Sequence, residues 1–147
     1  MSGPLRLRAP SGAHFVLASA SPRRLDLLAR IGLTPDAVSP ADIDETPKPR
    51  ELPDAYAERV AWEKANAVAA AHPDAFILAA DTVVASGRRI LPKAESEAEA
   101  RKCLGHLSGR RHKVIGAIRL IAPGGETRCR IATTTVAFKR LTDMEID

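Results

Sequence analysis

Two neighbouring arginines follow a short apolar segment and two small hydroxyl residues near the start of the chain. Residues 14–18 are typical of a buried strand, and Ser21 with Pro22 predicts a helix whose N-cap is Ser21. The first turn of such a helix presents free backbone N–H groups and the positive end of the helix dipole. Arg23 and Arg24 could add bidentate hydrogen bonds, so the segment favours a phosphate group. An ordinary capped helix with solvated arginines fits the same residues equally well.

An acidic residue directly follows a continuous apolar run. Residues 75–80 predict a strand buried on both faces, which ends at Asp81 and Thr82. Ligands of open α/β sheets bind at the carboxyl ends of strands, where Asp81 could bind a divalent metal or accept a proton from water. The alternative is an aspartate that only caps a local turn. Residues 83–91 predict a hairpin, which places Asp81 at a strand junction and favours the functional interpretation.

A lysine interrupts the apolar face of a long predicted helix over residues 53–72. The rest of that face consists of Ala57, Val60, Ala61, Ala65, Val68 and Ala71. An inward ammonium group at Lys64 costs free energy unless an anion meets it, so we expect either an internal carboxylate or an anionic ligand beside it. Snorkelling of Lys64 to the surface is a third interpretation, and an anionic ligand is favoured over it.

Five short motifs, in order along the chain, resemble those of the Maf family of nucleoside triphosphate pyrophosphatases. They are residues 19–24 (SASPRR), Asp44-Glu45, residues 63–65 (EKA), residues 80–84 (ADTVV) and residues 107–112 (LSGRRH). One such motif is weak evidence, whereas five in order, spread over nearly all of the chain after residue 12, are specific. The order of predicted elements favours an α/β fold around a mixed, partly antiparallel sheet. The resemblance implies a three-layer α/β sandwich with an elongated, curved sheet and a cleft between two lobes.

The resemblance also implies a reaction. Members of the family hydrolyse the α–β phosphate bond of a nucleotide to a monophosphate and pyrophosphate, and they use a divalent cation. By this resemblance Asp81 is the proton acceptor, and Arg23 and Thr82 fall at positions linked to substrate choice. The expected ligands of Mg²⁺ or Mn²⁺ are Glu45 and Asp81. The expected substrate contacts are Ser19, Ser21, Arg23, Arg24, Lys64, Thr82 and Lys93.

The residue types agree with this chemistry. Attack of water on an α-phosphorus needs an acidic group to hold or deprotonate the water, a metal, and cations around the pyrophosphate leaving group. Two positions have alternative interpretations. Glu45 lies in an acidic cluster with Asp42 and Asp44 that could simply be solvated, and Lys93 lies between Pro92 and Ala94 where family members often carry Gly-Lys-Pro.

The sequence permits two nucleotide preferences and two other functions. Pro22 followed directly by Arg23, together with Asp81-Thr82-Val83, resembles the branch acting on dTTP and UTP more than the branch preferring 7-methyl-GTP. A non-catalytic regulator of cell division would bind a nucleotide without turnover. A nucleic-acid-binding module would show steeply salt-dependent binding. The formal net charge of +4 permits it, but the 3% aromatic content and the clustered acidic residues oppose it.

Composition indicates one globular domain. The 147 residues are 45% hydrophobic, and the domain is expected over residues 13–147 after a flexible lead over residues 1–12. The sequence has neither a signal-peptide pattern nor an apolar run long enough to cross a membrane, so we expect a cytoplasmic protein with no membrane partner. Cys103 and Cys129 are then expected to be thiols. The family resemblance allows a homodimer.

The second half of the chain predicts a helix, two strands and another helix start. Residues 96–99 form a capping box, residues 112–121 and 127–138 read as strands joined by a tight loop, and Thr142 begins a second capping box. Family members continue beyond such a helix start through a glycine-rich segment that helps to close the nucleotide site. The 147-residue form is therefore expected to have an incomplete pocket, an exposed apolar face and low activity.

Overall fold

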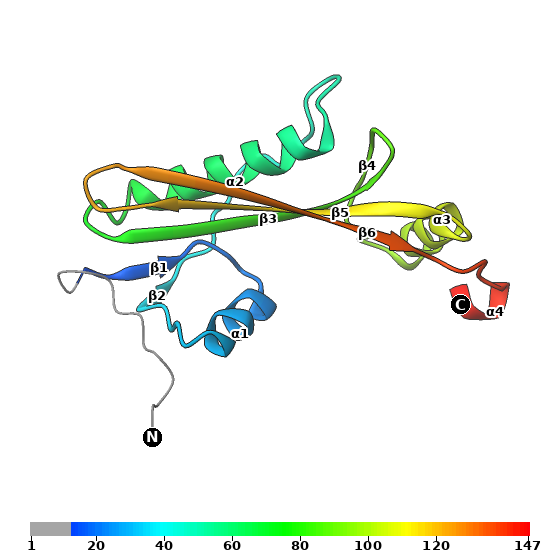
Figure 1. The fold of residues 1–147 in the computed structure, drawn as a ribbon, viewed down its shortest axis with the longest axis horizontal. Coiled ribbons are helices and arrows are strands. Elements are labelled where there is room, and N and C mark those ends of the chain that lie inside the picture. The colour runs from blue at the N-terminus through cyan, green and yellow to red at the C-terminus, as the bar shows by residue number, and fades with distance from the viewer. Residues whose placement is uncertain (1–12) are drawn as a thin grey trace.

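A mixed sheet of six strands forms the centre of the computed structural model, which describes residues 13–147 (Figure 1). The predicted lead over residues 1–12 lies outside the described residues. The strands are β1 (Phe15–Leu17), β2 (Ala37–Val38), β3 (Phe76–Ser86), β4 (Arg89–Leu91), β5 (Arg111–Ile121) and β6 (Thr127–Ala137). The helices are α1 (Pro22–Arg30), α2 (Pro53–Ala69), α3 (Glu97–Leu107) and α4 (Asp143–Ile146). The predicted α/β class is confirmed.

The sheet changes from parallel to antiparallel pairing at β3. The strand order is β2-β1-β3-β5-β6, with β4 also beside β3. β1 pairs in parallel with β2 and β3, because helical connections return the chain to the same end of the sheet. β3 pairs antiparallel with β4 and β5, and β5 with β6. The three long strands β3, β5 and β6 give the sheet the elongated shape that the resemblance implies (Figure 1).

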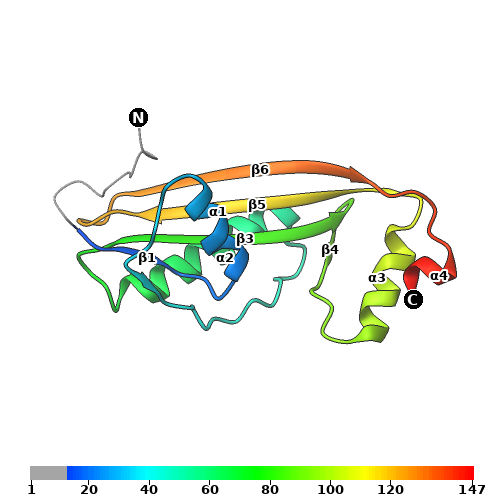
Figure 2. The same cartoon turned by 90° about the horizontal axis from the view of Figure 1, so that it is seen from below.

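Helices lie on both faces of the sheet, so the predicted three layers are present. α2 lies along one face and α1 on the opposite face (Figure 2). Every second side chain of β3 is buried on the α2 side: Ile77, Ala79, Asp81, Val83 and Ala85. Ala57, Ala61 and Ala65 of α2 are fully buried against this face. Their small side chains bring the axis of α2 close to the sheet, which is what places Lys64 near β3.

The predicted end of α2 is wrong by one turn. The helix ends at Ala69, and Ala71 is exposed instead of lying on the buried face. The N–H groups of Ala71 and His72 bond to carbonyls three residues back, which tightens the chain out of the α-helical geometry. Pro73 then disfavours a helical conformation at His72, the residue before it.

The predicted end of a strand at Asp81 is also wrong. Instead of a strand that ends there and a separate hairpin strand, β3 runs unbroken from Phe76 to Ser86, with Asp81 at its centre beside Ala117 of β5. The reason is that β5 pairs with β3 from Ile77 to Ala85, on both sides of Asp81. Residues before and after Asp81 also keep the same alternation toward α2, so the polar residue does not interrupt the strand.

The predicted helix starts in the second half of the chain are confirmed. Ser96 Oγ accepts a hydrogen bond from the N–H of Glu99 at 3.1 Å, and Thr142 Oγ1 accepts one from the N–H of Glu145 at 3.3 Å. α1 buries Leu28 and leaves Leu25 exposed. No helix in residues 13–147 combines the length and the apolar character needed to cross a membrane.

Candidate functional site

β3 has an opening along one edge, between two of its neighbouring strands. β1 pairs with β3 only as far as Leu78, and β4 pairs with it from Val84 onward. Among the described residues, no strand therefore pairs with residues 79–83 on this side. Asp81 and Thr82 lie at this opening, just beyond the carboxyl end of β1. The rule that ligands bind at carboxyl ends of strands thus applies through β1 instead of through β3.

β3 divides the site into two halves, because adjacent side chains of a strand point to opposite faces. Asp81 points toward α2, where its Oδ1 atom lies 3.4 Å from Lys64 Nζ. Thr82 belongs to the other face, where its Oγ1 atom accepts a hydrogen bond of 3.4 Å from Arg24 Nη2 of α1. The opening in the sheet is therefore the place where a ligand can contact both halves.

Lys64 joins two carboxylates in the first half. Its Nζ atom lies 2.9 Å from Glu45 Oε1 as well as 3.4 Å from Asp81 Oδ1, and the residue is 8% exposed. Lys64 is therefore paired with carboxylates of the protein itself. This is one of the two arrangements expected for it, the other being an anionic ligand. Burial raises the pKa of the Asp81 carboxyl above its ordinary value, and the Lys64 ammonium offsets this only in part. A carboxylate with a raised pKa is suited to accept a proton.

Ser19 and Arg24 form the second half. Ser19 is buried, and its Oγ atom accepts hydrogen bonds from Arg24 Nη1 at 2.9 Å and from the N–H of Ser21 at 3.1 Å. Ser21 is the N-cap and Pro22 begins the helix, as predicted, although within the described structure the Ser21 side chain makes no capping hydrogen bond. Ser19 thus holds the Arg24 guanidinium beside Thr82, while Arg23 is exposed.

A cavity of about 610 Å³ joins the opening in β3 to the loop that follows β4. Its polar lining includes Glu45, Asp81, Thr82 and Lys93, so the structure brings these four predicted site residues together. Tyr56, Val83, Ile90, Leu91 and Pro92 supply apolar surface. The predicted contacts Ser19, Ser21, Arg23 and Arg24 are not part of this lining and lie toward α1.

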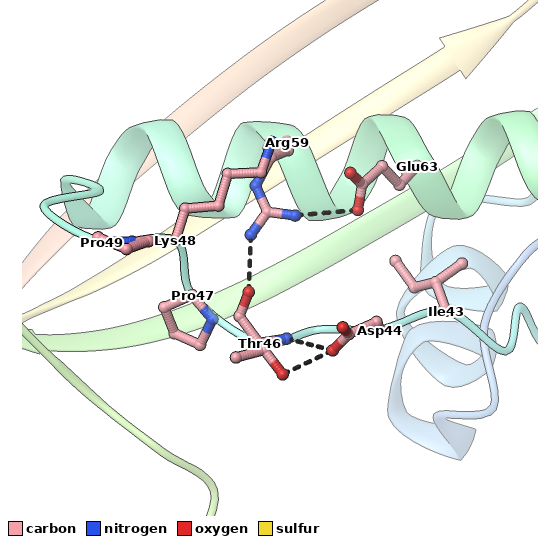
Figure 3. A pocket seen from close by; sticks show the side chains of 8 residues that line it. All are labelled: Ile43, Asp44, Thr46, Pro47, Lys48, Pro49, Arg59 and Glu63. Atoms are coloured by element: carbon pink, nitrogen blue, oxygen red, sulfur yellow. Dashed lines mark hydrogen bonds and ion pairs between the residues drawn. The ribbon is translucent and has the colours of Figure 1, made fainter.

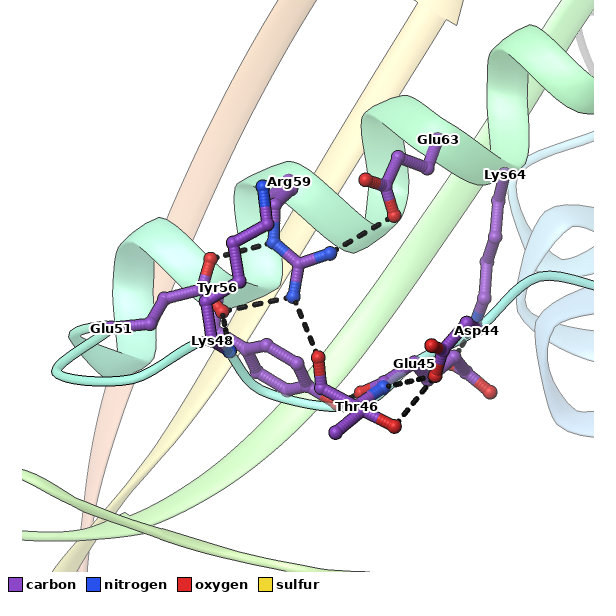
Figure 4. Close-up of polar contacts among 9 residues, drawn as sticks. All are labelled: Asp44, Glu45, Thr46, Lys48, Glu51, Tyr56, Arg59, Glu63 and Lys64. Carbon is purple, nitrogen blue, oxygen red and sulfur yellow. Dashed lines mark hydrogen bonds and ion pairs between the residues drawn. The ribbon is translucent and has the colours of Figure 1, made fainter.

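Glu45 belongs to an ordered loop, residues 42–51, which we call the acidic loop. Asp44 Oδ1 accepts hydrogen bonds from Thr46 N–H at 3.0 Å and from Thr46 Oγ1 at 2.6 Å, and the Tyr56 hydroxyl donates to the Glu45 carbonyl at 2.6 Å (Figure 4). The Glu45 carboxylate is therefore paired with Lys64 and not only solvated, whereas Asp44 is exposed and bonds within the loop. Sequence reasoning missed Tyr56, because a contact between a loop and a helix has no fixed spacing.

Arg59 of α2 was also missed, and it has the most hydrogen-bond partners near the site. Its guanidinium donates to Glu51, to Glu63 and to the Thr46 carbonyl (Figures 3 and 4). The spacing of Arg59 and Glu63, four residues apart on a helix, is the one signal in the sequence that could have indicated part of this cluster.

The Arg59–Glu51 pair predicts an acid-sensitive contribution to stability. The hydrogen bond from Arg59 lowers the pKa of the Glu51 carboxyl below its ordinary value of 4.5. A lowered pKa stabilises the fold above the ordinary value, and this contribution is lost as the pH falls through the lowered pKa. Denaturant unfolding of the parent and of Glu51→Gln should therefore differ at about pH 6 and converge toward about pH 3. A difference that stays constant over this range would contradict the assignment.

The carboxylates of Glu45 and Asp81 fit a divalent cation whose remaining coordination positions are filled by a ligand. Glu45 and Asp81 already share one cation, the Lys64 ammonium. No group of three or more histidine, cysteine, aspartate or glutamate side chains within residues 13–147 is arranged to hold a metal alone. Mg²⁺ is commonly bound by one or two carboxylates together with substrate phosphates, and the donor set here matches that arrangement.

Comparison with known proteins places the chain among nucleotide-processing enzymes. Residues 14–147 match the family described as Maf-like protein. A protein of Caulobacter vibrioides named dTTP/UTP pyrophosphatase is 61% identical over 137 residues, which cover 93% of this chain and 71% of that protein. A protein of Rhodospirillum rubrum with the same name is 62% identical over 144 residues, covering 98% of this chain and 68% of that protein.

Solved structures share the fold at low sequence identity. A nucleoside-triphosphatase, also described as a dITP/XTP pyrophosphatase, from Mycobacterium abscessus superposes with a TM-score of 0.53 at 22% identity, covering 86% of this chain and 74% of that one. The Ham1 protein of Staphylococcus aureus gives a TM-score of 0.55 at 20% identity, covering 82% of this chain and 69% of that chain. At these identities the likeness shows the fold alone.

Proposed function

Because this chain belongs to the Maf-like protein family, we propose that it is a nucleoside triphosphate pyrophosphatase that hydrolyses the α–β phosphate bond of dTTP or UTP. The observation that carries the proposal is the placement of Asp81: a buried carboxylate with a raised pKa, paired with Lys64, at an opening in the sheet. Arg24 of α1, Lys64 of α2 and Lys93 after β4 lie around this opening together with the carboxylates of Glu45 and Asp81. The cations suit phosphate oxygens, and the carboxylates suit a divalent cation that accompanies a triphosphate.

The proposed reaction assigns one proton transfer to Asp81. Its carboxylate accepts a proton from water, the water oxygen bonds to the α-phosphorus, and the bond from that phosphorus to the bridging oxygen breaks to release pyrophosphate. Arg24, Lys64 and Lys93 would neutralise phosphate oxygens and the leaving group. Glu45 and Asp81 would hold Mg²⁺ or Mn²⁺, which supplies further neutralisation of phosphate charge when bound.

The proposed substrate preference rests on residues from both sides of the opening. Arg24 and Thr82 are joined by a hydrogen bond. The segment after Pro22 and the segment after Asp81 therefore lie next to each other at the opening in the sheet, where both could contact the same ligand. The resemblance links Arg23 and Thr82 to substrate choice, and the curated relatives from Caulobacter and Rhodospirillum are named dTTP/UTP pyrophosphatases. These points favour a pyrimidine triphosphate over 7-methyl-GTP.

A direct competition assay tests this preference. With Mg²⁺ present, kcat/KM from pyrophosphate release is expected to be at least about tenfold higher for dTTP or UTP than for 7-methyl-GTP. The reverse order would contradict the preference. Nucleotide binding without turnover would instead support the non-catalytic regulator, and salt-dependent binding to DNA or RNA would support the nucleic-acid-binding module.

The proposed compartment is the cytoplasm. Nucleoside triphosphates are available there, and Cys103 and Cys129 are free in the structure, as thiols are in a reducing compartment. Fractionation of cells that produce the tagged protein tests this assignment.

A further inference from the structure

The acidic loop is attached to α2 by two side chains that lie one helical turn apart. In the described structure the loop has no helix or strand of its own, so its conformation depends on contacts with its surroundings. Tyr56 and Arg59 of α2 both donate hydrogen bonds to it (Figure 4). The acceptors are the carbonyls of Glu45 and Thr46, two consecutive residues.

Arg59 is held rigidly by its own partners. Its Nε and Nη2 atoms donate to the two carboxylate oxygens of Glu51 at 2.6 and 2.9 Å, and its Nη1 atom donates to Glu63 at 3.0 Å. Nη2 also donates to the Thr46 carbonyl at 3.1 Å. The side chain is 16% exposed, and its guanidinium lies 5.5 Å from the centre of the Tyr56 ring. Four of its five N–H groups are used in this way, so Arg59 is suited to fix the loop.

These contacts use the backbone of Glu45 and leave its side chain able to reach the site. The Tyr56 hydroxyl bonds the Glu45 carbonyl at 2.6 Å, and Asp44 bonds the N–H of Thr46 on the other side. The Glu45 carboxylate itself reaches Lys64 at 2.9 Å and is 44% exposed. An exposed carboxylate on an irregular loop is held close to a buried lysine only if the loop backbone is restrained.

Building on the proposed function, we propose that Arg59 and Tyr56 are positioning residues that hold the acidic loop against α2, so that the Glu45 carboxylate stays beside Lys64 and Asp81, where it can bind a divalent cation. Arg59 acts through Glu45 and lies outside the lining of the cavity, whereas Tyr56 holds the loop through its hydroxyl and also contributes its ring to that lining. Loss of Arg59 should therefore change the metal requirement more than the rate at saturating metal.

Three variants test this role by graded loss of contacts. Tyr56→Phe removes one hydroxyl and should raise the Mg²⁺ concentration for half-maximal turnover about three- to tenfold. Arg59→Lys keeps the charge but loses the planar fork, and Arg59→Leu loses both; each should raise it about 10- to 100-fold, as is typical when a group that orients a metal ligand is removed. At saturating Mg²⁺, kcat should stay within about threefold of the parent for Arg59→Lys. Tyr56→Phe keeps the ring that lines the cavity, and its effect is read from the Mg²⁺ requirement.

Arg119→Lys provides a matched control. Arg119 is also 16% exposed, pairs with a glutamate of α2 at 3.6 Å and stacks on an aromatic ring at 4.6 Å, but its partners are Glu58 and Trp62, outside the acidic loop. Arg119 makes one ion pair where Arg59 makes four hydrogen bonds, so this variant should perturb the packing against α2 with a smaller loss of stability and keep the parental metal requirement. An equal rise in metal requirement for both variants would overturn the proposal, since the effect would then follow from general destabilisation of α2.

A double-mutant cycle separates positioning from independent effects. Glu45→Gln should itself raise the metal requirement, and adding Arg59→Lys to it should raise the requirement no further, because Arg59 acts only through Glu45. Additive effects of the two substitutions would overturn the proposal.

Two readouts do not depend on turnover. Hydrogen exchange of the backbone amides in residues 44–48 should be faster in Arg59→Lys and Tyr56→Phe than in Arg119→Lys, and binding of Mn²⁺ alone, followed by electron paramagnetic resonance, should weaken in the same two variants. If the parent released no pyrophosphate, the proposed function would fail while these measurements still decided the role of Arg59 and Tyr56. Unchanged exchange and unchanged Mn²⁺ binding would overturn the positioning role in an active enzyme.

Discussion

Replacing Asp81 with asparagine is expected to lower turnover about 10²- to 10⁴-fold, the range typical for loss of a general base. Asparagine keeps the shape of the side chain in its buried position but cannot accept the proton of the attacking water. The effect should appear mainly in kcat, because Arg24 and Lys93 can still contact the phosphates. Steady-state kinetics with UTP, at saturating Mg²⁺, measures it.

Two controls show whether the loss comes from chemistry. The thermal midpoint of Asp81→Asn should fall less than that of Lys64→Met, because Lys64 keeps the Glu45 carboxylate at 2.9 Å. Nucleotide binding by calorimetry should weaken less than about tenfold. Turnover within a few-fold of the parent would remove Asp81 from the proton-accepting role. Loss of turnover together with loss of folding would leave the role to be decided with Asp81→Glu, which keeps the carboxylate and should retain measurable activity.

Replacing Lys64 with methionine is expected to destabilise the fold by about 3–5 kcal/mol, the cost typical of removing one partner from a buried ion pair. The methionine fills the apolar face of α2, but Asp81, which is 4% exposed, then has no counter-ion from this helix. Denaturant unfolding of the parent and of Lys64→Met measures the difference.

The double variant Lys64→Met/Asp81→Asn isolates the cause of that loss. Removing the unpaired charge should recover most of the stability, because the remaining amide is far less costly to bury than a carboxylate. Mg²⁺ should also raise the thermal midpoint of Lys64→Met more than that of the parent, since a cation can then take the place of the ammonium beside Glu45 and Asp81. Parental stability of Lys64→Met without added metal would show that the buried pair contributes little.

Lys64 shows what the sequence could predict about the site. A single charged residue on an otherwise apolar helix face requires a partner of opposite charge, and this argument needs no knowledge of the fold. It predicted a carboxylate or an anionic ligand, and the structure supplies Glu45 and Asp81. Which carboxylates these would be depended on the packing of α2 against β3 and on the course of the acidic loop, which local patterns do not contain.

β3 shows where prediction from the sequence failed. A polar Asp-Thr pair after an apolar run suggested the end of a strand, but pairing with residues 113–121 of β5 keeps the strand intact. The feature that makes Asp81 reachable is an opening between β1 and β4, and it depends on where two short strands end relative to β3. Strand ends and register are set by tertiary contacts, so the opening could not be read from the motif itself.

The sequence did not indicate Arg59 as a residue of the site, for a related reason. Its pairing with Glu63 follows helical spacing, whereas Glu51 precedes it by eight residues and Thr46 by thirteen, and neither spacing has a regular meaning. Solvated charges therefore remained an alternative for the acidic loop beside the expected metal ligand Glu45. In the structure Tyr56 and Arg59 of α2 donate hydrogen bonds to two consecutive carbonyls of this loop.

Hydrolysis of UTP in ¹⁸O-labelled water tests the central claim most directly, because it reports which phosphorus atom the water attacks. The account predicts UMP and pyrophosphate in equal amounts, with the label in the UMP phosphate, and a rate that falls with Asp81→Asn. Mass spectrometry of the two products measures the position of the label. Label in the pyrophosphate, or release of UDP and orthophosphate, would show attack on a different phosphorus and would contradict the proposed α–β hydrolysis.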